Sequence, residues 1–168
     1  MTGILGAVLI GGRSSRFGSD KAQAMFGDRS LAEHAAAALS PFAQEVVMIG
    51  GDGVPDLPRP GLGPLGGIAA ALDYGASRGF RCVLTIGCDM PRVPDEVFET
   101  LLHRAPAYCG DAPVLGLWPS ALGAHLLSYL EVGGDRSVRG WARAVGAIPI
   151  ASGSAIPNVN TRDDLMAL

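Results

Sequence analysis

The feature that most constrains the fold is an apolar run that leads directly into a glycine-rich loop. Residues 4–10 read ILGAVLI, and they are apolar on both faces, as in the central strand of a parallel sheet. The chain then passes through GGRSSRFGSDK, residues 11–21, before its first helix pattern. Glycines remove Cβ atoms where backbone must approach a ligand, and the N–H groups freed in such a turn bind anionic oxygens. A triphosphate is the occupant that this loop suits best.

Apolar segments of strand length alternate with helix patterns along the rest of the chain. The further strands expected are 45–49, 80–87, 113–118 and 147–150, and the expected helices are 30–39, one that opens at 63–67, 96–104, 120–130, 137–145 and 162–167. Such alternation favours βαβ units with right-handed crossovers and a mostly parallel sheet. We therefore expect one domain over residues 1–168, a Rossmann-like α/β fold arranged as a three-layer α/β/α sandwich.

Several of the expected helices have start signals. Ser30 with Glu33 forms a capping box, and Pro64 suits the first turn of the helix that follows it. Asp95 is expected to cap the helix over 96–104, and Thr161 to begin the terminal helix. These signals place each long loop between the end of a strand and the start of a helix.

The loops after the strands are expected to form a single site. Ligands of a parallel sheet bind beyond the carboxyl ends of its strands, and the loops 11–21 and 50–63 and Asp89 all follow strands. Nucleotidyl transfer needs cations for the triphosphate and one or two carboxylates for a divalent cation. Arg16 and Lys21 are the candidate phosphate cations, and Asp89 is the candidate ligand of Mg²⁺.

Each of these residues also has a purely structural alternative. Arg16 and Asp20 would suit a surface ion pair of little energetic value. Asp89, which precedes Met90 and a proline, would suit the cap of a turn. Asp20 would otherwise orient Lys21 or the loop itself.

Composition limits the classes of partner. The chain has 168 residues with 13 basic and 16 acidic side chains, a formal net charge of −3. This balance gives no general attraction for nucleic acid or an anionic membrane, so any phosphate binding must be local. No apolar run approaches the roughly 18 residues of a membrane span. The three cysteines form no C-x-x-C pair, and the three histidines have no metal-ligand spacing. We therefore expect a cytoplasmic protein with buried, reduced thiols.

Four motifs, in order along the chain, resemble those of one known family. The first loop matches the G-G-x-S-x-R-x-G-x-D-K signature of small nucleotidyltransferases at Gly11, Gly12, Ser14, Arg16, Gly18, Asp20 and Lys21. The segments 63–68 (GPLGGI), 88–91 (CDMP) and 158–161 (NVNT) resemble elements of the molybdenum cofactor guanylyltransferases. That family has a nucleotidyltransferase form of the α/β fold. It joins GMP from GTP to the molybdenum-molybdopterin cofactor and releases pyrophosphate.

The resemblance implies a role for each matching residue. The implied nucleotide-binding residues are Leu9, Ile10, Gly11, Gly12, Lys21, Asp56 and Asp89. The implied catalytic residues are Arg16, Lys21 and Asp89, with Asp89 also a ligand of the Mg²⁺ cofactor, and Asn158 and Asn160 are implied on the acceptor side. GTP and the molybdopterin cofactor are the implied partners. Contact with proteins that supply or receive the cofactor is a further expectation.

The chain also departs from the family pattern. Ile10 stands where the family has alanine, and Ile49-Gly50-Gly51 lacks the asparagine that the family places on the nucleotide. Alternatives therefore remain open: a related transferase that uses CTP, one that uses a sugar phosphate as acceptor, or a nucleotide-binding accessory protein without turnover. The presence of Arg16, Lys21 and Asp89 together favours an enzyme, because binding alone needs fewer charged groups.

Overall fold

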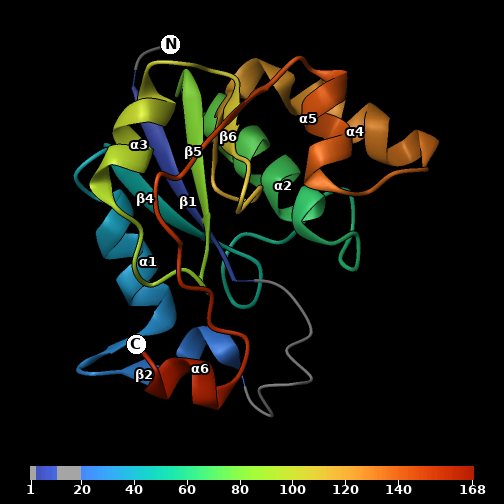
Figure 1. Cartoon of the computed structure of the whole chain (residues 1–168). Coiled ribbons are helices and arrows are strands. Elements are labelled where there is room, and N and C mark those ends of the chain that lie inside the picture. The colour runs from blue at the N-terminus through green and yellow to red at the C-terminus, as the bar shows by residue number, and fades with distance from the viewer. Residues whose placement is uncertain (1–2, 11–19) are drawn as a thin grey trace.

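The computed structural model describes residues 3–10 and 20–168, and strands alternate with helices along this part of the chain (Figure 1). The strands are β1 (Ile4–Leu9), β2 (Met25–Phe26), β3 (Arg29–Ser30), β4 (Glu45–Ile49), β5 (Cys82–Gly87), β6 (Ala107–Cys109), β7 (Gly116–Pro119) and β8 (Ile148–Ile150). The helices are α1 (Leu31–Leu39), α2 (Pro64–Ser77), α3 (Asp95–Leu102), α4 (Gly123–Val132), α5 (Val138–Ala144) and α6 (Arg162–Met166), with 3₁₀ turns η1 (Lys21–Gln23) and η2 (Ser120–Leu122).

Six of these strands form one sheet in the order β4-β1-β5-β7-β6-β8. β1 is parallel to both β4 and β5, β7 is antiparallel to β5 and β6, and β8 is parallel to β6. The prediction of a mostly parallel sheet is therefore confirmed. It follows from these directions that β4, β1, β5 and β6 all end at the same edge of the sheet.

Helices cover both faces of this sheet, which confirms the three-layer α/β/α sandwich (Figure 1). Side chains alternate along β1, as they must in a strand. Leu5, Ala7 and Leu9 belong to the core beneath α2, α4 and α5, whereas Val8 belongs to the core beneath α1 and α3. The first strand is therefore buried on both sides, as its continuous apolar run predicts.

The predicted start signals of two helices are confirmed in atomic detail. The backbone N–H of Glu33 donates to Oγ of Ser30 at 3.2 Å, and the N–H of Ser30 donates to Oε2 of Glu33 at 2.7 Å. Thr161 and Asp164 form a second capping box at the start of α6. Because helix termini leave N–H groups without partners, such side chains decide where a helix begins.

Other sequence predictions need correction. The sequence predicts no strand at 107–109, yet β6 lies there, because three residues carry too little pattern and the pairing partners β7 and β8 are distant in sequence. The strand predicted over 113–118 begins only at Gly116. Asp95 does not cap α3: Pro94 holds that position without a side-chain hydrogen bond, and Asp95 lies in the first turn, where its charge suits the helix dipole.

The C-terminal segment returns to the carboxyl edge of the sheet. After β8 the chain runs along the molecule to α6, which lies beside the small hairpin of β2 and β3 (Figure 1). Val159 and Leu31 are fully buried there, and Phe26, Leu165 and Leu168 pack against them. This packing brings Asn160 to Lys21, 139 positions away in sequence.

Two further expectations concern thiols and membranes. Cys82, Cys88 and Cys109 are free and buried, as predicted. In the ranges that the structure describes, no helix has both the length and the apolar character needed to cross a membrane.

Candidate active site

A cavity of about 830 Å³ lies at the edge where the parallel strands end. Its size is in the usual range for a ligand pocket, roughly 300–1,000 Å³. Its lining includes six of the residues to which the resemblance assigns a role: Leu9, Ile10, Lys21, Asp56, Asp89 and Asn158. They come from β1, η1, the loop after β4, the end of β5 and the C-terminal segment.

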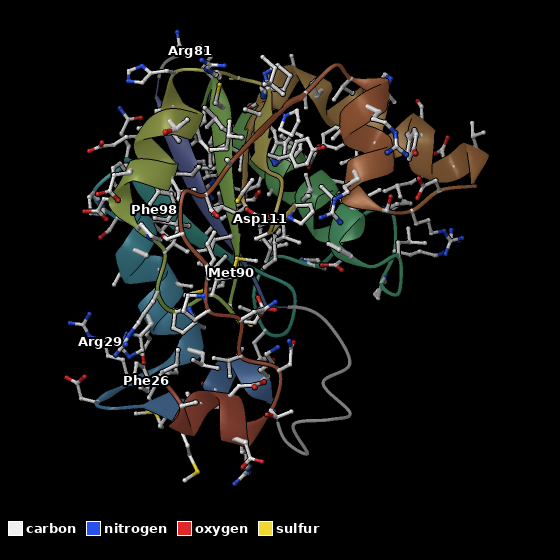
Figure 2. The ribbon with its side chains drawn as sticks, viewed as in Figure 1. Phe26, Arg29, Arg81, Met90, Phe98 and Asp111 are labelled. Atoms are coloured by element: carbon white, nitrogen blue, oxygen red, sulfur yellow. The ribbon has the colours of Figure 1, made fainter. Side chains whose placement is uncertain are left out.

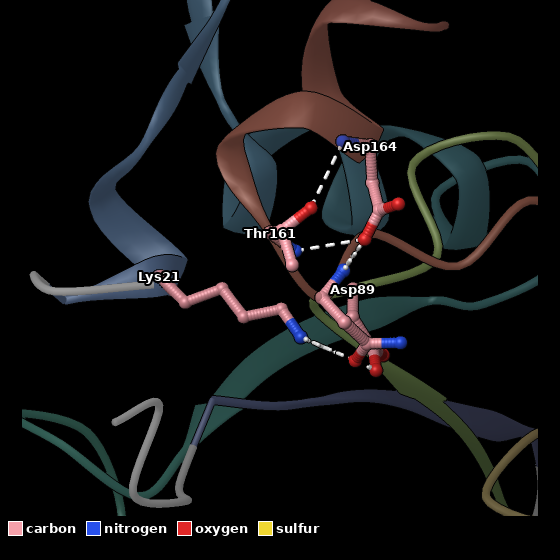
Figure 3. Close-up of polar contacts among 5 residues, drawn as sticks. Lys21, Asp89, Thr161 and Asp164 are labelled. Atoms are coloured by element: carbon pink, nitrogen blue, oxygen red, sulfur yellow. Dashed lines mark hydrogen bonds and ion pairs between the residues drawn. The ribbon is translucent and has the colours of Figure 1, made fainter. Parts of the chain in front are cut away.

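Lys21 links three of these segments. It begins η1, which Asp20 caps by accepting the N–H of Ala22 at 3.1 Å. Its Nζ lies 3.6 Å from Oδ2 of Asp89 and donates to Oδ1 of Asn160 at 3.2 Å (Figure 3). The side chains of Lys21 and Asp89 are 15% and 25% exposed, so a ligand can reach both charges. Asp20 therefore orients the turn that presents the lysine.

Asp89 owes its position to the backbone on both sides of it. The N–H of Cys88 donates to the carbonyl of Leu9 at 3.1 Å, and the carbonyl of Asp89 accepts the N–H of Val159 at 2.8 Å. Gly87 leaves room for this carboxylate, because a Cβ at position 87 would push Oδ1 of Asp89 aside. Among the described residues the carboxylate pairs with Lys21 and accepts no backbone N–H, so the turn-cap alternative is not supported.

Cys88 also lines the cavity but is not a nucleophile. Burial, together with the negative charge of Asp89, raises the pKa of its thiol to about 11. Because the thiolate is the reactive form, the thiol is inert at neutral pH. Cys88 therefore acts as a small apolar residue beneath the carboxylate.

The start of α6 holds Asn160 in place. Oδ2 of Asp164 accepts the backbone N–H groups of Asn160 and Thr161, each at 2.8 Å, and the N–H of Asp164 donates to Oγ1 of Thr161 (Figure 3). These hydrogen bonds lower the pKa of the Asp164 carboxyl below its usual value. The amide that contacts Lys21 is thus fixed to a capped helix start and not to a free loop.

Asp56 lies on another wall of the cavity, in the loop that precedes α2. Its Oδ1 is buried and accepts no hydrogen bond from any described residue. Burial raises the pKa of this carboxyl, because the charged form is poorly solvated. The side chain packs against Gly66 in the first turn of α2, where a Cβ would lie 3.5 Å from Oδ2. Asp56 therefore brings to the cavity wall a carboxylate whose Oδ1 has no partner among the described residues.

Comparison with known proteins identifies the family. The sequence-family model of the MobA-like NTP transferase domain matches residues 6–146 of this chain. This chain belongs to that family. A molybdenum cofactor guanylyltransferase of Rhizobium leguminosarum bv. trifolii is 37% identical over 155 residues, which cover 81% of this chain and 73% of that protein. A molybdenum cofactor guanylyltransferase of Rhizobium johnstonii is 34% identical over 188 residues, which cover 97% of this chain and 90% of that protein.

Solved structures show the same fold. Molybdopterin-guanine dinucleotide biosynthesis protein A from Archaeoglobus fulgidus is similar with a TM-score of 0.73 at 24% identity, over 97% of this chain and 95% of that one. The 2-C-methyl-D-erythritol 4-phosphate cytidylyltransferase of Thermus thermophilus is similar with a TM-score of 0.64 at 16% identity, over 96% and 95%. These likenesses confirm the nucleotidyltransferase form of the α/β fold.

In this MobA-like NTP transferase the structure brings together most of the predicted site residues. Leu9, Ile10, Lys21, Asp56, Asp89 and Asn158 line the cavity, and Asn160 contacts Lys21. Gly11, Gly12 and Arg16 lie outside the described residues, so their predicted roles stay predictions. The alternative of an ion pair between Arg16 and Asp20 also falls there.

Sequence reasoning missed two parts of this MobA-like site. The sequence gives no sign that Gly87 belongs to the site, because it looks like the last apolar residue of a strand. Asp111 lines the cavity from the loop between β6 and β7, and the weak strand pattern before it hid its place at the carboxyl edge. A prediction of β6 would have revealed Asp111, because a carboxylate two residues beyond a strand end is a recognisable signal of a site residue.

The donor set fits a magnesium ion that arrives with phosphates. Among the described residues no group of three or more His, Cys, Asp or Glu side chains can hold a metal. Mg²⁺ typically takes one or two protein carboxylates and completes its shell with substrate phosphates and water. Asp89, accessible in the cavity and beside Lys21, fits the role of that carboxylate. A zinc-type site of several protein ligands does not fit these residues.

Proposed function

We propose that this protein transfers GMP from GTP to the phosphate of the molybdenum-molybdopterin cofactor, with Mg²⁺ as its cofactor and with release of pyrophosphate. The observation that supports this most directly is the cavity lined by Lys21, Asp89 and Asp56, in which Lys21 also contacts Asn160 and Oδ1 of Asp56 has no partner among the described residues. The relatives named molybdenum cofactor guanylyltransferase, at 37% and 34% identity, support the choice of base and acceptor.

The reaction is a displacement at phosphorus. An oxygen of the acceptor phosphate attacks the α-phosphorus of GTP and forms a new P–O–P linkage. The bond from the α-phosphorus to the bridging oxygen of the β-phosphate breaks, and pyrophosphate leaves with that electron pair. Negative charge therefore gathers on the leaving group and must be stabilised in place.

The residues of the cavity divide this work. Lys21 places its ammonium where it can bind phosphate oxygens, and Asn160 holds the lysine toward the cavity. Asp89 would hold Mg²⁺, which when bound neutralises phosphate charge. Asp56 accepts N–H donors of guanine with its carboxylate, and Leu9 and Ile10 also line the cavity. Arg16 adds a second phosphate cation in this proposal.

A cytoplasmic location forms part of the same proposal. The three cysteines are free thiols, which supports a reducing compartment. The formal net charge of −3 supports small-molecule substrates in preference to nucleic acid.

The test is pyrophosphate release in the presence of GTP, Mg²⁺ and molybdenum-molybdopterin, with ATP, CTP and UTP in parallel. The wild type should release pyrophosphate with GTP, and chelation of the metal should abolish turnover. Asp89→Asn should also abolish turnover while circular dichroism stays unchanged. Asp73→Asn is the matched control, because Asp73 is exposed on α2 and does not line the cavity.

Three results would count against the proposal. Faster turnover with CTP would favour a cytidylyltransferase, and full activity of Asp89→Asn or of the wild type in chelator would remove the metal role. Nucleotide binding without pyrophosphate release would favour an accessory protein.

A further inference from the structure

Asp111 is a cavity carboxylate for which neither the phosphate site nor the guanine site has a use. It lies two residues beyond β6 and lines the same cavity as Asp56 (Asp111 is labelled in Figure 2). Asp56 follows β4, and β4 and β6 are separated by β1, β5 and β7. Four strand spacings of roughly 4.8 Å each put about 19 Å between the two strand ends. The centre formed by Lys21 and Asp89 lies between them.

The backbone around Asp111 is held from two sides. The N–H of Gly110 donates to the carbonyl of Ile150 at 2.9 Å, and the guanidinium of Arg139 donates to the carbonyl of Gly110 at 2.7 Å. The side chain has a polar neighbour as well: Oγ of Ser152 lies 2.9 Å from Oδ2 of Asp111 and 2.6 Å from the carbonyl of Ser154, so its one hydrogen is shared between these two acceptors. A carboxylate has about four lone-pair positions, so both oxygens keep acceptor capacity. The carboxylate of Asp111 is therefore exposed and can still accept hydrogen bonds from a ligand.

The residues next to Asp111 suit a flat ring. Ala112, Pro113 and Val114 follow it along the cavity wall, and all three are partly buried. The carbonyl of Val114 accepts the hydroxyl of Thr85 at 2.6 Å, which ties this wall to β5. An apolar strip beside a carboxylate suits the face and the N–H edge of a heteroaromatic ring, because ligand pockets combine apolar walls with a few placed polar groups.

We propose that Asp111, oriented by Ser152, recognises the pterin ring of the acceptor through paired hydrogen bonds to its 2-amino-4-oxopyrimidine edge. This inference rests on the proposed function. Guanine and pterin present the same pair of adjacent N–H donors on that edge, and a carboxylate accepts both at once. The cavity has one such carboxylate on each side of the Lys21 and Asp89 centre, in keeping with a reaction that joins two molecules with this edge. Asp56 serves the guanine and Asp111 serves the pterin.

The experiment separates the two sides kinetically. In Asp111→Asn the amide offers one acceptor and one donor group, so a pair of ring donors can no longer be matched. We expect the KM for molybdenum-molybdopterin to rise by about 10-fold or more, with the KM for GTP and the thermal shift by GTP unchanged. Asp56→Asn should give the opposite pattern. Ser152→Ala should raise the acceptor KM in the same direction but less, because it removes only the orienting hydroxyl.

A binding measurement without turnover tests the same contact. Pterin-6-carboxylate is fluorescent, and its titration in excess GMP reports on the acceptor side while the guanine side is filled. We expect weaker binding to Asp111→Asn than to wild type and to the exposed-surface control Asp73→Asn. Melting curves of each variant check that the fold is kept.

The outcomes are distinguishable. If the wild type is active and the KM for molybdenum-molybdopterin is unchanged in Asp111→Asn, this inference alone is overturned. The same follows from a lower melting temperature without any change in the acceptor KM, since this would mark Asp111 and Ser152 as a structural tie between two loops. An increase in the KM for GTP in Asp111→Asn would exchange the two sides and overturn it too. If the wild type releases no pyrophosphate with GTP and molybdenum-molybdopterin, the proposed function falls and this inference with it.

Discussion

Replacing Asp56 with asparagine should stabilise the free protein and weaken its preference for GTP. Oδ1 of Asp56 is buried and accepts no hydrogen bond within the described part of the chain, and burial raises the pKa of the carboxyl. A raised pKa means that the folded state disfavours the charged form. The free energy of unfolding therefore falls as pH rises from the unfolded-state pKa, about 3.9, through the folded-state pKa. At neutral pH the wild type carries this penalty in full, and the uncharged asparagine avoids it.

The size of both effects follows from the geometry. A buried polar atom without a partner costs about 1–3 kcal/mol. Asparagine keeps a polar side chain and relieves only part of this, so we expect a gain of about 1 kcal/mol, or about 2–4 °C in Tm for a protein of this size. A hydrogen bond from guanine to a charged acceptor is worth about 1.5–3 kcal/mol, so its loss should weaken GTP binding by about 10- to 100-fold.

The assay is thermal unfolding of wild type, Asp56→Asn and Asp73→Asn, each alone and with equal concentrations of GTP, ATP, CTP or UTP and Mg²⁺. The wild type should gain most from GTP, because a ligand that binds only the folded state raises Tm according to its affinity. In Asp56→Asn the advantage of GTP over the other nucleotides should shrink while the unliganded Tm rises. A lower unliganded Tm, or an undiminished preference for GTP, would refute the reasoning. A larger shift with CTP in the wild type would point to a cytidylyltransferase.

Three further predictions concern the same centre. Gly87→Ala should lower turnover by about 10²-fold without loss of circular dichroism, because the new Cβ displaces the carboxylate of Asp89; normal turnover would show that the strand end can move. Lys21→Ala should lower turnover by about 10²-fold or more with little change in Tm, and a large loss of Tm would instead mark the lysine as structural. Asp164→Asn should lower the Tm at neutral pH, and the deficit should shrink as pH falls below about 4, since a lowered carboxyl pKa gives stability only while the group is ionised. A deficit that stayed constant from pH 7 to pH 3 would show that the charge is not involved.

The fold was predictable wherever the pattern is local and long. Ile4–Leu9 is a continuous apolar run and Cys82–Gly87 is one apart from Thr85, because both faces are buried. Ser30 and Thr161 mark helix starts through contacts three residues away. The three-residue strand β6 was not predictable, because its stability comes from pairing with β7 and β8 and not from its own residues. Asp95 was misplaced by one position, since an acidic residue suits both a cap and a first turn.

The sequence by itself determined which chemistry the site can contain. A lysine after a glycine-rich turn and an aspartate at a strand end are recognisable from residue type and order, because parallel strands bring their carboxyl ends to one edge. Only the tertiary structure decided how these groups meet: Asn160 reaches Lys21 from 139 positions away, and Gly87 clears the space for Asp89. The same is true of the unpartnered oxygen of Asp56 and of Asp111 in the same cavity. Burial, hydrogen-bond partners and distance are properties of the packed chain, and no local pattern encodes them.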